Sequence, residues 1–108
     1  MQVIYARCAA VDVGKDVIAV AVRLPGDGPD GRITIKRTFK TFYGVLAEAA
    51  RWLASQGVTH VAMEATGIYS MPVYYALLEH GGFAKVLVCN AGHVRNVPGR
   101  KTDFSDAE

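Results

Sequence analysis

Short apolar runs, separated by polar and glycine-rich stretches, make up the first forty residues. Residues 4–13 and 17–24 are rich in β-branched and small apolar side chains, and only residues 14–16 separate these two runs. Residues 32–39 alternate between apolar and polar, after a stretch at 25–31 that holds three glycines and two prolines. This pattern predicts three strands joined by tight turns, the third being an outer strand with one wet face.

The spacing of the apolar positions changes after residue 40. Between Phe42 and Leu53 apolar residues recur at helical spacing, which predicts a helix with Thr41 as its N-cap and Gly57 as its C-terminal stop. Residues 58–64 are apolar again and predict a short buried strand.

A second helix and a last strand complete the pattern. Ser70 and Pro72 begin a helix that ends at the glycine pair 81–82, and residues 84–89 form an apolar strand. We expect loops at 65–69 and 90–101, because both contain glycine.

The predicted order is therefore β-β-β-α-β-α-β, an α/β fold with a mixed sheet and helices on its faces. This order resembles that of the ribonuclease H-like fold, in which the first strand lies in mid-sheet beside the fourth. The sugar kinase and actin-type ATPase core shares the order, so the order alone does not select a function.

Composition supports one globular domain. The chain has 108 residues, of which 51% are hydrophobic and 20% charged. No apolar run reaches the roughly 18 residues of a membrane span, and the start lacks the features of a secretion signal, so we expect a cytoplasmic protein with no membrane partner. Cys8 and Cys89 lie far apart in apolar runs and have no zinc-ligand spacing, which favours two buried thiols over a disulfide.

The distribution of charge says more than the net charge of +2. Residues 32–40 contain four cations and no acid, and residues 80–102 contain four more, again with no acid. Such segments suit a polyanion, although a solvated basic face is the commoner explanation of any one of them. The candidate nucleic-acid contacts are Lys15, Arg95, Arg100 and Lys101.

Two carboxylates stand at the ends of apolar strands: Asp12 in the first and Glu64 in the fourth. Burying a lone carboxylate is costly unless it is paired or bound to a metal. If the two strands are neighbours, both acids meet at one end of the sheet, and a proton or a divalent cation relieves their repulsion. Taken singly, Asp12 also fits a turn residue and Glu64 a loop cap.

A second acidic pair follows Thr102. In a helix starting there, Asp103 and Asp106 share one face, although acids at a helix start are also ordinary. Four carboxylates at a strand end form an oxygen cage suited to Mg²⁺ or Mn²⁺. Two such ions would activate a nucleophile and stabilise the leaving oxygen of a phosphodiester.

Three segments carry a family resemblance: Val-Asp-Val-Gly-Lys-Asp at 11–16, Met-Glu-Ala-Thr-Gly-Ile-Tyr at 63–69 and Gly-Arg-Lys-Thr-Asp-Phe-Ser-Asp-Ala at 99–107. They resemble the N-terminal domain of the DEDD transposases, insertion-sequence enzymes related to the Piv-type DNA invertases. The resemblance covers nearly the whole chain and implies that residues 1–108 form a RuvC-like catalytic domain.

The resemblance also implies a function and a site. Its acidic tetrad would be Asp12, Glu64, Asp103 and Asp106, binding Mg²⁺ (or Mn²⁺) for DNA strand cleavage and exchange during transposition. DNA is the implied partner, and a structured RNA guides some members. Family members continue past Asp106 into a helix and a second domain with a serine nucleophile, neither of which these 108 residues contain.

Two alternatives remain open. One is a non-catalytic remnant that binds nucleic acid or associates with itself; for an isolated fragment we expect inactivity, displaced Asp103 and Asp106, weak metal binding and homo-oligomers through an exposed apolar surface. The other is a phosphotransferase of the actin-like and sugar-kinase group, whose first hairpin also carries Asp-x-Gly. It is disfavoured because residues 14–16 lack the usual phosphate-binding turn and no late adenosine-binding glycine motif is present.

Overall fold

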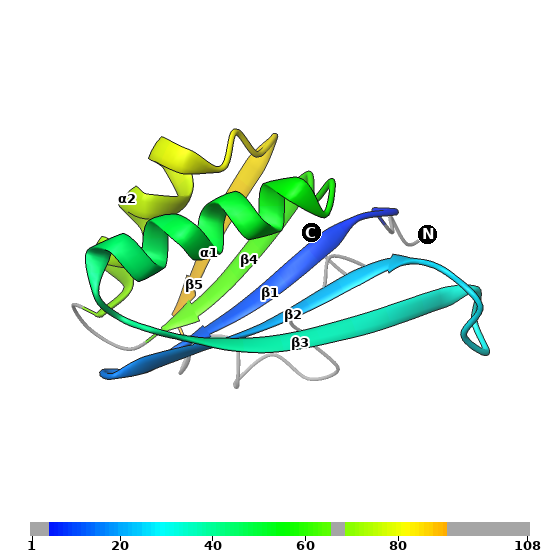
Figure 1. Ribbon diagram of the computed structural model, residues 1–108, viewed down its shortest axis with the longest axis horizontal. Coiled ribbons are helices and arrows are strands. Elements are labelled where there is room, and N and C mark those ends of the chain that lie inside the picture. Colours follow the sequence, from blue (N-terminus) through cyan, green and yellow to red (C-terminus); the bar gives the residue numbers. More distant parts are fainter. Residues whose placement is uncertain (1–4, 66–68, 91–108) are drawn as a thin grey trace.

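The computed structural model describes residues 5–65 and 69–90, which form a mixed sheet and two helices (Figure 1). The elements are β1 (Cys8–Val13), β2 (Val17–Pro25), β3 (Arg32–Lys40), α1 (Tyr43–Ser55), β4 (His60–Ala65), α2 (Ser70–His80) and β5 (Lys85–Asn90). The predicted order of strands and helices is confirmed. The loop was predicted over 90–101, but Asn90 belongs to β5; residues 91–101 and the predicted helix from Thr102 lie outside the described residues.

β1 is the central strand of the sheet. The strand order is β3-β2-β1-β4-β5, with β1 antiparallel to β2 and parallel to β4, and β4 parallel to β5. The first strand therefore lies beside the fourth, as predicted, and α1 and α2 belong to the crossovers that join parallel strands. β3 is an outer strand, also as predicted.

Both described helices pack on the same face of the sheet. Alternate strand residues such as Val11, Val20 and Met63 point to that face and are 0–2% exposed, forming one core with Leu46 and Leu53 of α1. Figure 1 shows α1 and α2 side by side along the sheet. The residues between these core positions project from the opposite face, which neither α1 nor α2 covers.

The C-terminus of α1 has the glycine signal that the sequence predicts. Gly57 has a φ of 77°, its N–H donates to Ala54 (2.9 Å), and the N–H of Val58 donates to Leu53 (3.3 Å). These two bonds form a Schellman motif, which satisfies carbonyls at the end of the helix.

Thr41 is not the N-cap of α1, so that prediction is wrong. The N-cap is Phe42, which makes no side-chain capping bond. The Thr41 hydroxyl instead donates to the backbone oxygen of Lys15 at 3.0 Å, because the end of β3 lies against the β1–β2 turn. Thr41 therefore stabilises the turn rather than the helix.

The two helices are also joined by polar groups. The Tyr43 hydroxyl of α1 donates to a carboxylate oxygen of Glu79 and lies 3.1 Å from Nε2 of His80, both on α2. The hydrogen bond to Glu79 is the main reason that the pKa of Tyr43 is raised above its ordinary value. This contact fixes the relative position of the helices on the face away from the predicted acidic site.

The two cysteines are not joined in a disulfide, as predicted. Cys8 is buried, whereas Cys89 is only half-buried and in this respect differs from the prediction. Within residues 5–65 and 69–90, neither helix has both the length and the apolar character needed to cross a membrane.

Candidate functional site

Asp12 and Glu64 are direct neighbours across two parallel strands. The register of β1 and β4 pairs Asp12 with Glu64, so the predicted meeting of the two acids is confirmed. Adjacent strands are about 4.8 Å apart, and directly paired residues of parallel strands project to the same face. The two carboxylates therefore extend together from the face that α1 and α2 leave uncovered.

The expected burial of these carboxylates is wrong for Asp12. Asp12 is exposed and Glu64 is half-buried, because both project away from the helix-covered core. Water therefore reaches the Asp12 carboxylate, and the main cost of the arrangement is repulsion between two like charges.

A hollow of about 600 Å³ lies beside this pair. Its floor includes three alanines, Ala10 of β1 and Ala19 and Ala21 of β2, whose side chains are too small to fill the space above the sheet. Among the described residues, the full lining is Ala10, Val11, Asp12, Ala19, Val20, Ala21, Lys36, Arg37, Thr38 and Glu64. The hollow thus has acids on one side and polar residues of β3 on the other.

A row of residues crosses the sheet at the level of the acids. In register, Thr38 of β3 pairs with Ala19, Ala19 with Asp12, Asp12 with Glu64, and Glu64 with Cys89 of β5. Neither Thr38 nor Cys89 was predicted at the site. The alternation of side chains along a strand could have placed Thr38 and Cys89 on the same face as the acids. Only the register of the strands shows that they share a row with Asp12 and Glu64.

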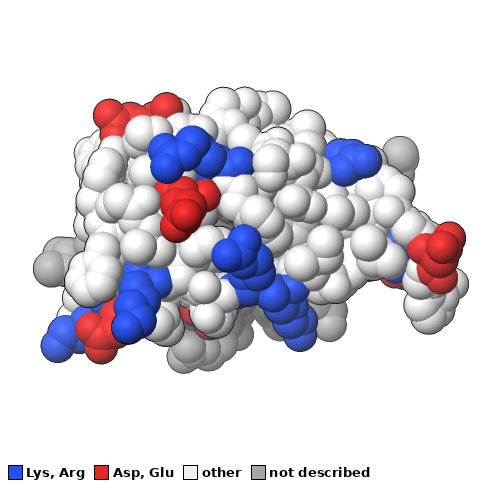
Figure 2. Space-filling model, in the orientation of Figure 1, with Lys and Arg blue, Asp and Glu red and all other residues white. Residues whose placement is uncertain are grey.

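The basic segment 32–40 does not form one patch. Arg37 stacks on the helix-covered side, with its guanidinium carbon 4.6 Å from the centre of the Phe39 ring and 4.8 Å from that of Trp52. Lys36 belongs to the opposite face of the sheet and lines the hollow, whose lining also includes Arg37. On the face seen in Figure 2, basic and acidic groups are likewise interspersed rather than gathered by sign.

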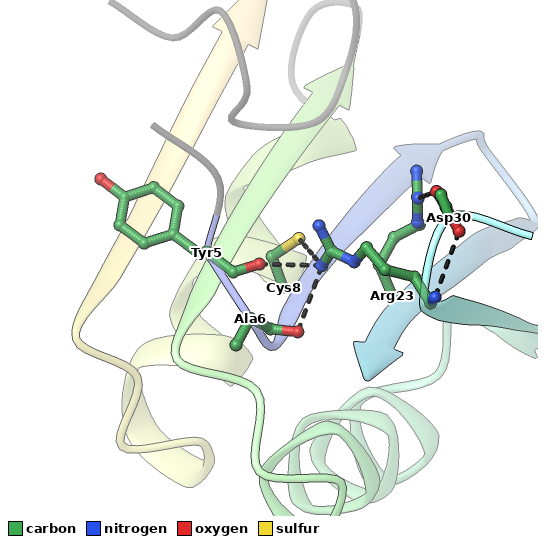
Figure 3. Close-up of polar contacts among 6 residues, drawn as sticks. Tyr5, Ala6, Cys8, Arg23 and Asp30 are labelled. Atoms are coloured by element: carbon green, nitrogen blue, oxygen red, sulfur yellow. Dashed lines mark hydrogen bonds and ion pairs between the residues drawn. The ribbon is translucent and has the colours of Figure 1, made fainter. Parts of the chain in front are cut away.

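Arg32 has an internal role at the opposite end of β1. Its guanidinium donates to the backbone oxygens of Tyr5 (2.8 Å) and Ala6 (3.1 Å). The backbone N–H of Arg32 donates to the carboxylate of Asp30 (3.1 Å), and the same carboxylate forms an ion pair with Arg23 at 2.8 Å. Figure 3 shows these contacts around Tyr5, Ala6 and Cys8. These contacts hold the chain just before β1. We predicted a strand over residues 4–13, but β1 begins at Cys8, so residues 5–7 do not belong to it.

The remaining predicted site residues divide into two groups. Lys15 lies exposed in the β1–β2 turn, just beyond the end of β1 that carries Asp12. The other predicted residues lie outside the described part of the chain: Arg95, Arg100, Lys101, Asp103 and Asp106.

The chemistry of the described pair fits a hard divalent cation. Carboxylate oxygens are the ligands that Mg²⁺ prefers, and Mg²⁺ is commonly held by one or two carboxylates together with water and phosphate oxygens. Within the described residues there is no cluster of three or more His, Cys, Asp or Glu side chains suited to a metal. At a cation site, Asp12 and Glu64 would supply only part of a coordination shell, and other oxygens would fill the remaining positions.

Solved structures with a similar fold come from proteins with different functions. The Holliday junction resolvase of fowlpox virus aligns with a TM-score of 0.56 at 20% identity, over 78% of this chain and 60% of that protein. A Ppx/GppA family member from Aquifex aeolicus aligns with a TM-score of 0.52 at 18% identity, over 78% and 35% of the two chains. The type II variant of the Aquifex aeolicus Ppx/GppA phosphatase gives 0.50 and 16%, over 80% and 36%.

These likenesses establish the fold, and the resolvase agrees with the predicted ribonuclease H-like architecture. The chain spans between about a third and three fifths of the solved structures that it matches. No curated protein matches its sequence. The sequence model of a transposase family, the DEDD transposases of the IS110 type, matches residues 9–108. Since this match covers most of the chain and includes both paired acids, the protein belongs to the DEDD transposase family.

Proposed function

We propose that this chain is the catalytic domain of a transposase and that Asp12 and Glu64 hold a divalent cation, Mg²⁺ or Mn²⁺, for DNA strand cleavage and exchange. The observation that carries the proposal is the direct pairing of the two acids on β1 and β4. Membership of the DEDD transposase family supports DNA as the substrate.

The sheet determines what these two residues can do. Because β1 and β4 are hydrogen-bonded neighbours within the core of the sheet, the spacing of Asp12 and Glu64 is fixed before any ligand binds. Their oxygens would hold a divalent cation at the side of the hollow that they line. A divalent cation bound there supplies positive charge that stabilises the charge developing on a phosphodiester during cleavage.

The other members of the site are part of the proposal. Asp103 and Asp106 complete the acidic tetrad, which raises the number of carboxylates at the cation from two to four. Arg95, Arg100 and Lys101, together with Lys15, contact the DNA backbone, where cations give affinity without reading sequence.

The assembly of the protein is also proposed. The family resemblance implies a second, serine-bearing domain that would act together with the one described here. We place both in the cytoplasm. A guide RNA is a further candidate partner. Homo-oligomers are supported by apolar side chains of α2 at helical spacing, Met71, Tyr75 and Leu78, which are 45%, 53% and 51% exposed.

The test removes one charge at a time from the pair. Asp12→Asn and Glu64→Gln should each lower Mg²⁺-dependent cleavage of the DNA substrate by the complete protein at least a hundredfold, since changes even to residues behind a metal's ligands commonly cost about 10–100-fold. Glu48→Gln is the matched control, because Glu48 lies exposed on α1 away from the hollow. Full cleavage by either variant would remove that residue from the cation site.

A further inference from the structure

The side of the hollow opposite the acids is formed by Lys36 and Thr38 of β3. Thr38 lies in the same cross-sheet row as Asp12, with Ala19 between them. Lys36 lies one row away, where the register runs through Ala21 to Ala10. From the ordinary dimensions of a sheet, Lys36 and Asp12 are about 10 Å apart across the strands and about 7 Å along them.

Lys36 is available for a ligand. Within the described residues, it makes no hydrogen bond or ion pair, either with Asp12 or with another side chain. The neighbouring cations on β3 are engaged elsewhere, Arg37 with two aromatic rings and Arg32 with backbone oxygens. Lys36 is exposed, so the desolvation cost of keeping its charged ammonium group at the hollow is small.

The floor between the two sides favours a phosphate backbone over a base. Ala10, Ala19 and Ala21 offer no side-chain donor or acceptor with which to read a base edge. A strand crossing this floor, with one phosphate at the cation site, brings further phosphates toward β3. An ammonium and a hydroxyl are the groups that bind such phosphates in protein–DNA contacts.

We propose that Lys36 and Thr38 bind a phosphate of the same DNA strand that Asp12 and Glu64 engage through their cation. The Lys36 ammonium and the Thr38 hydroxyl donate to its non-bridging oxygens, and these contacts hold the strand across the alanine floor. The proposal rests on the proposed function, since it takes the substrate of that site to be DNA.

The experiment measures binding of a fluorescent single-stranded oligothymidine to the protein by anisotropy, in Ca²⁺ and over a series of salt concentrations. Lys36→Gln should weaken binding about tenfold, as expected for loss of one charged hydrogen bond. It should also reduce the slope of log affinity against log salt by about 0.7, the value for one phosphate contact on a single strand. Thr38→Val should weaken binding about threefold without changing the slope, since it removes a neutral donor.

Two control variants separate charge from structure. Lys36→Arg should retain most of the affinity and the full salt slope, because it keeps the cation. Arg51→Gln removes a cation from the exposed surface of α1 and should leave both values unchanged. Unfolding temperatures of all variants, measured in parallel, verify that the exposed substitutions leave the fold intact.

The result separates this proposal from the function on which it rests. Wild-type affinity and slope for Lys36→Gln, or equal losses for Arg51→Gln, would overturn the role of Lys36. Mn²⁺ binding followed by calorimetry tests the acids independently: Lys36→Gln should bind Mn²⁺ as the wild type does, whereas Asp12→Asn should not. A loss of DNA affinity in Lys36→Gln combined with unaltered Mn²⁺ binding in Asp12→Asn would support the phosphate contact and contradict the cation site.

Discussion

Asp12 and Glu64 are each ordinary residues at the end of a strand, and their interest comes from being paired. The strands that carry them are fixed by hydrogen bonds, so the Cα atoms of Asp12 and Glu64 cannot separate without moving the sheet. Like charges directly opposite each other on neighbouring strands reduce stability by about 0.2–1 kcal/mol. The protein therefore carries a small cost in stability at the place where a cation would offset it.

From this cost we predict how a variant behaves in the absence of metal ions. In EDTA, Glu64→Gln should raise the free energy of unfolding by about 0.5 kcal/mol, because it removes the repulsion while keeping the shape of the side chain. For a domain of this size the melting temperature should rise by roughly 2–4 °C, and the gain should shrink in 1 M NaCl through screening.

Thermal unfolding by circular dichroism measures this effect. Glu48→Gln, the same substitution on the exposed surface of α1, should leave the melting temperature unchanged to within about 1 °C. A stability loss in Glu64→Gln would mean that the carboxylate is held by a favourable contact rather than strained by Asp12.

The sequence allowed Asp12 and Glu64 to be located but not Lys36. Each acid interrupts an apolar run, and two such runs in the predicted order become neighbours in the sheet. Lys36 is one of four cations in its segment, and its contact with the hollow depends on the register between β2 and β3. That register depends on the geometry of the turn at residues 26–31, and the composition of the turn does not determine this geometry.

At the scale of elements, local sequence signals predicted the C-terminal end of α1 correctly and its N-cap wrongly. Gly57 was identified because a left-handed residue after a helix strongly favours glycine. Thr41 was assigned wrongly because its hydroxyl bonds a distant backbone oxygen, that of Lys15. A residue with the sequence properties of a helix cap can thus form a tertiary hydrogen bond instead, and the local sequence pattern does not show this.

Two glycines, Gly44 in the first turn of α1 and Gly57 just beyond its C-cap, provide opposite predictions. Gly57→Ala should lower the free energy of unfolding by about 1–2 kcal/mol, because alanine at a φ of 77° is strained. Its added Cβ would also lie 3.0 Å from Cδ of Arg7. Gly44→Ala should instead raise stability by about 0.5–1 kcal/mol, since Gly44 is helical and a Cβ there meets nothing within 4 Å.

Urea unfolding of the two variants in the same buffer compares these effects directly. Opposite shifts in the midpoint, with unchanged slopes, are expected. A stabilising Gly57→Ala would contradict the left-handed conformation assigned to the end of α1.

At the scale of the whole molecule, the fold leaves function undecided and the placement of the acids supports one choice. A resolvase and two Ppx/GppA proteins share this arrangement of strands and helices. In the present chain, α1 and α2 cover one face of the sheet, and two paired acids and a hollow lie on the other. The sequence predicted the family through its motifs, whereas the hollow beside the acids required the structure.

The pair of acids beside this hollow predicts how the whole molecule responds to divalent cations. A ligand that binds only the folded protein stabilises it, and a cation at ten times its dissociation constant adds about 1.4 kcal/mol. Mg²⁺ or Mn²⁺ should therefore raise the melting temperature of the wild type by roughly 5–10 °C, and EDTA should reverse the shift. Since unfolding separates Asp12 from Glu64, Asp12→Asn should lose most of the response. NaCl at matched ionic strength controls for screening, and an equal response in Asp12→Asn would place the stabilising cation elsewhere.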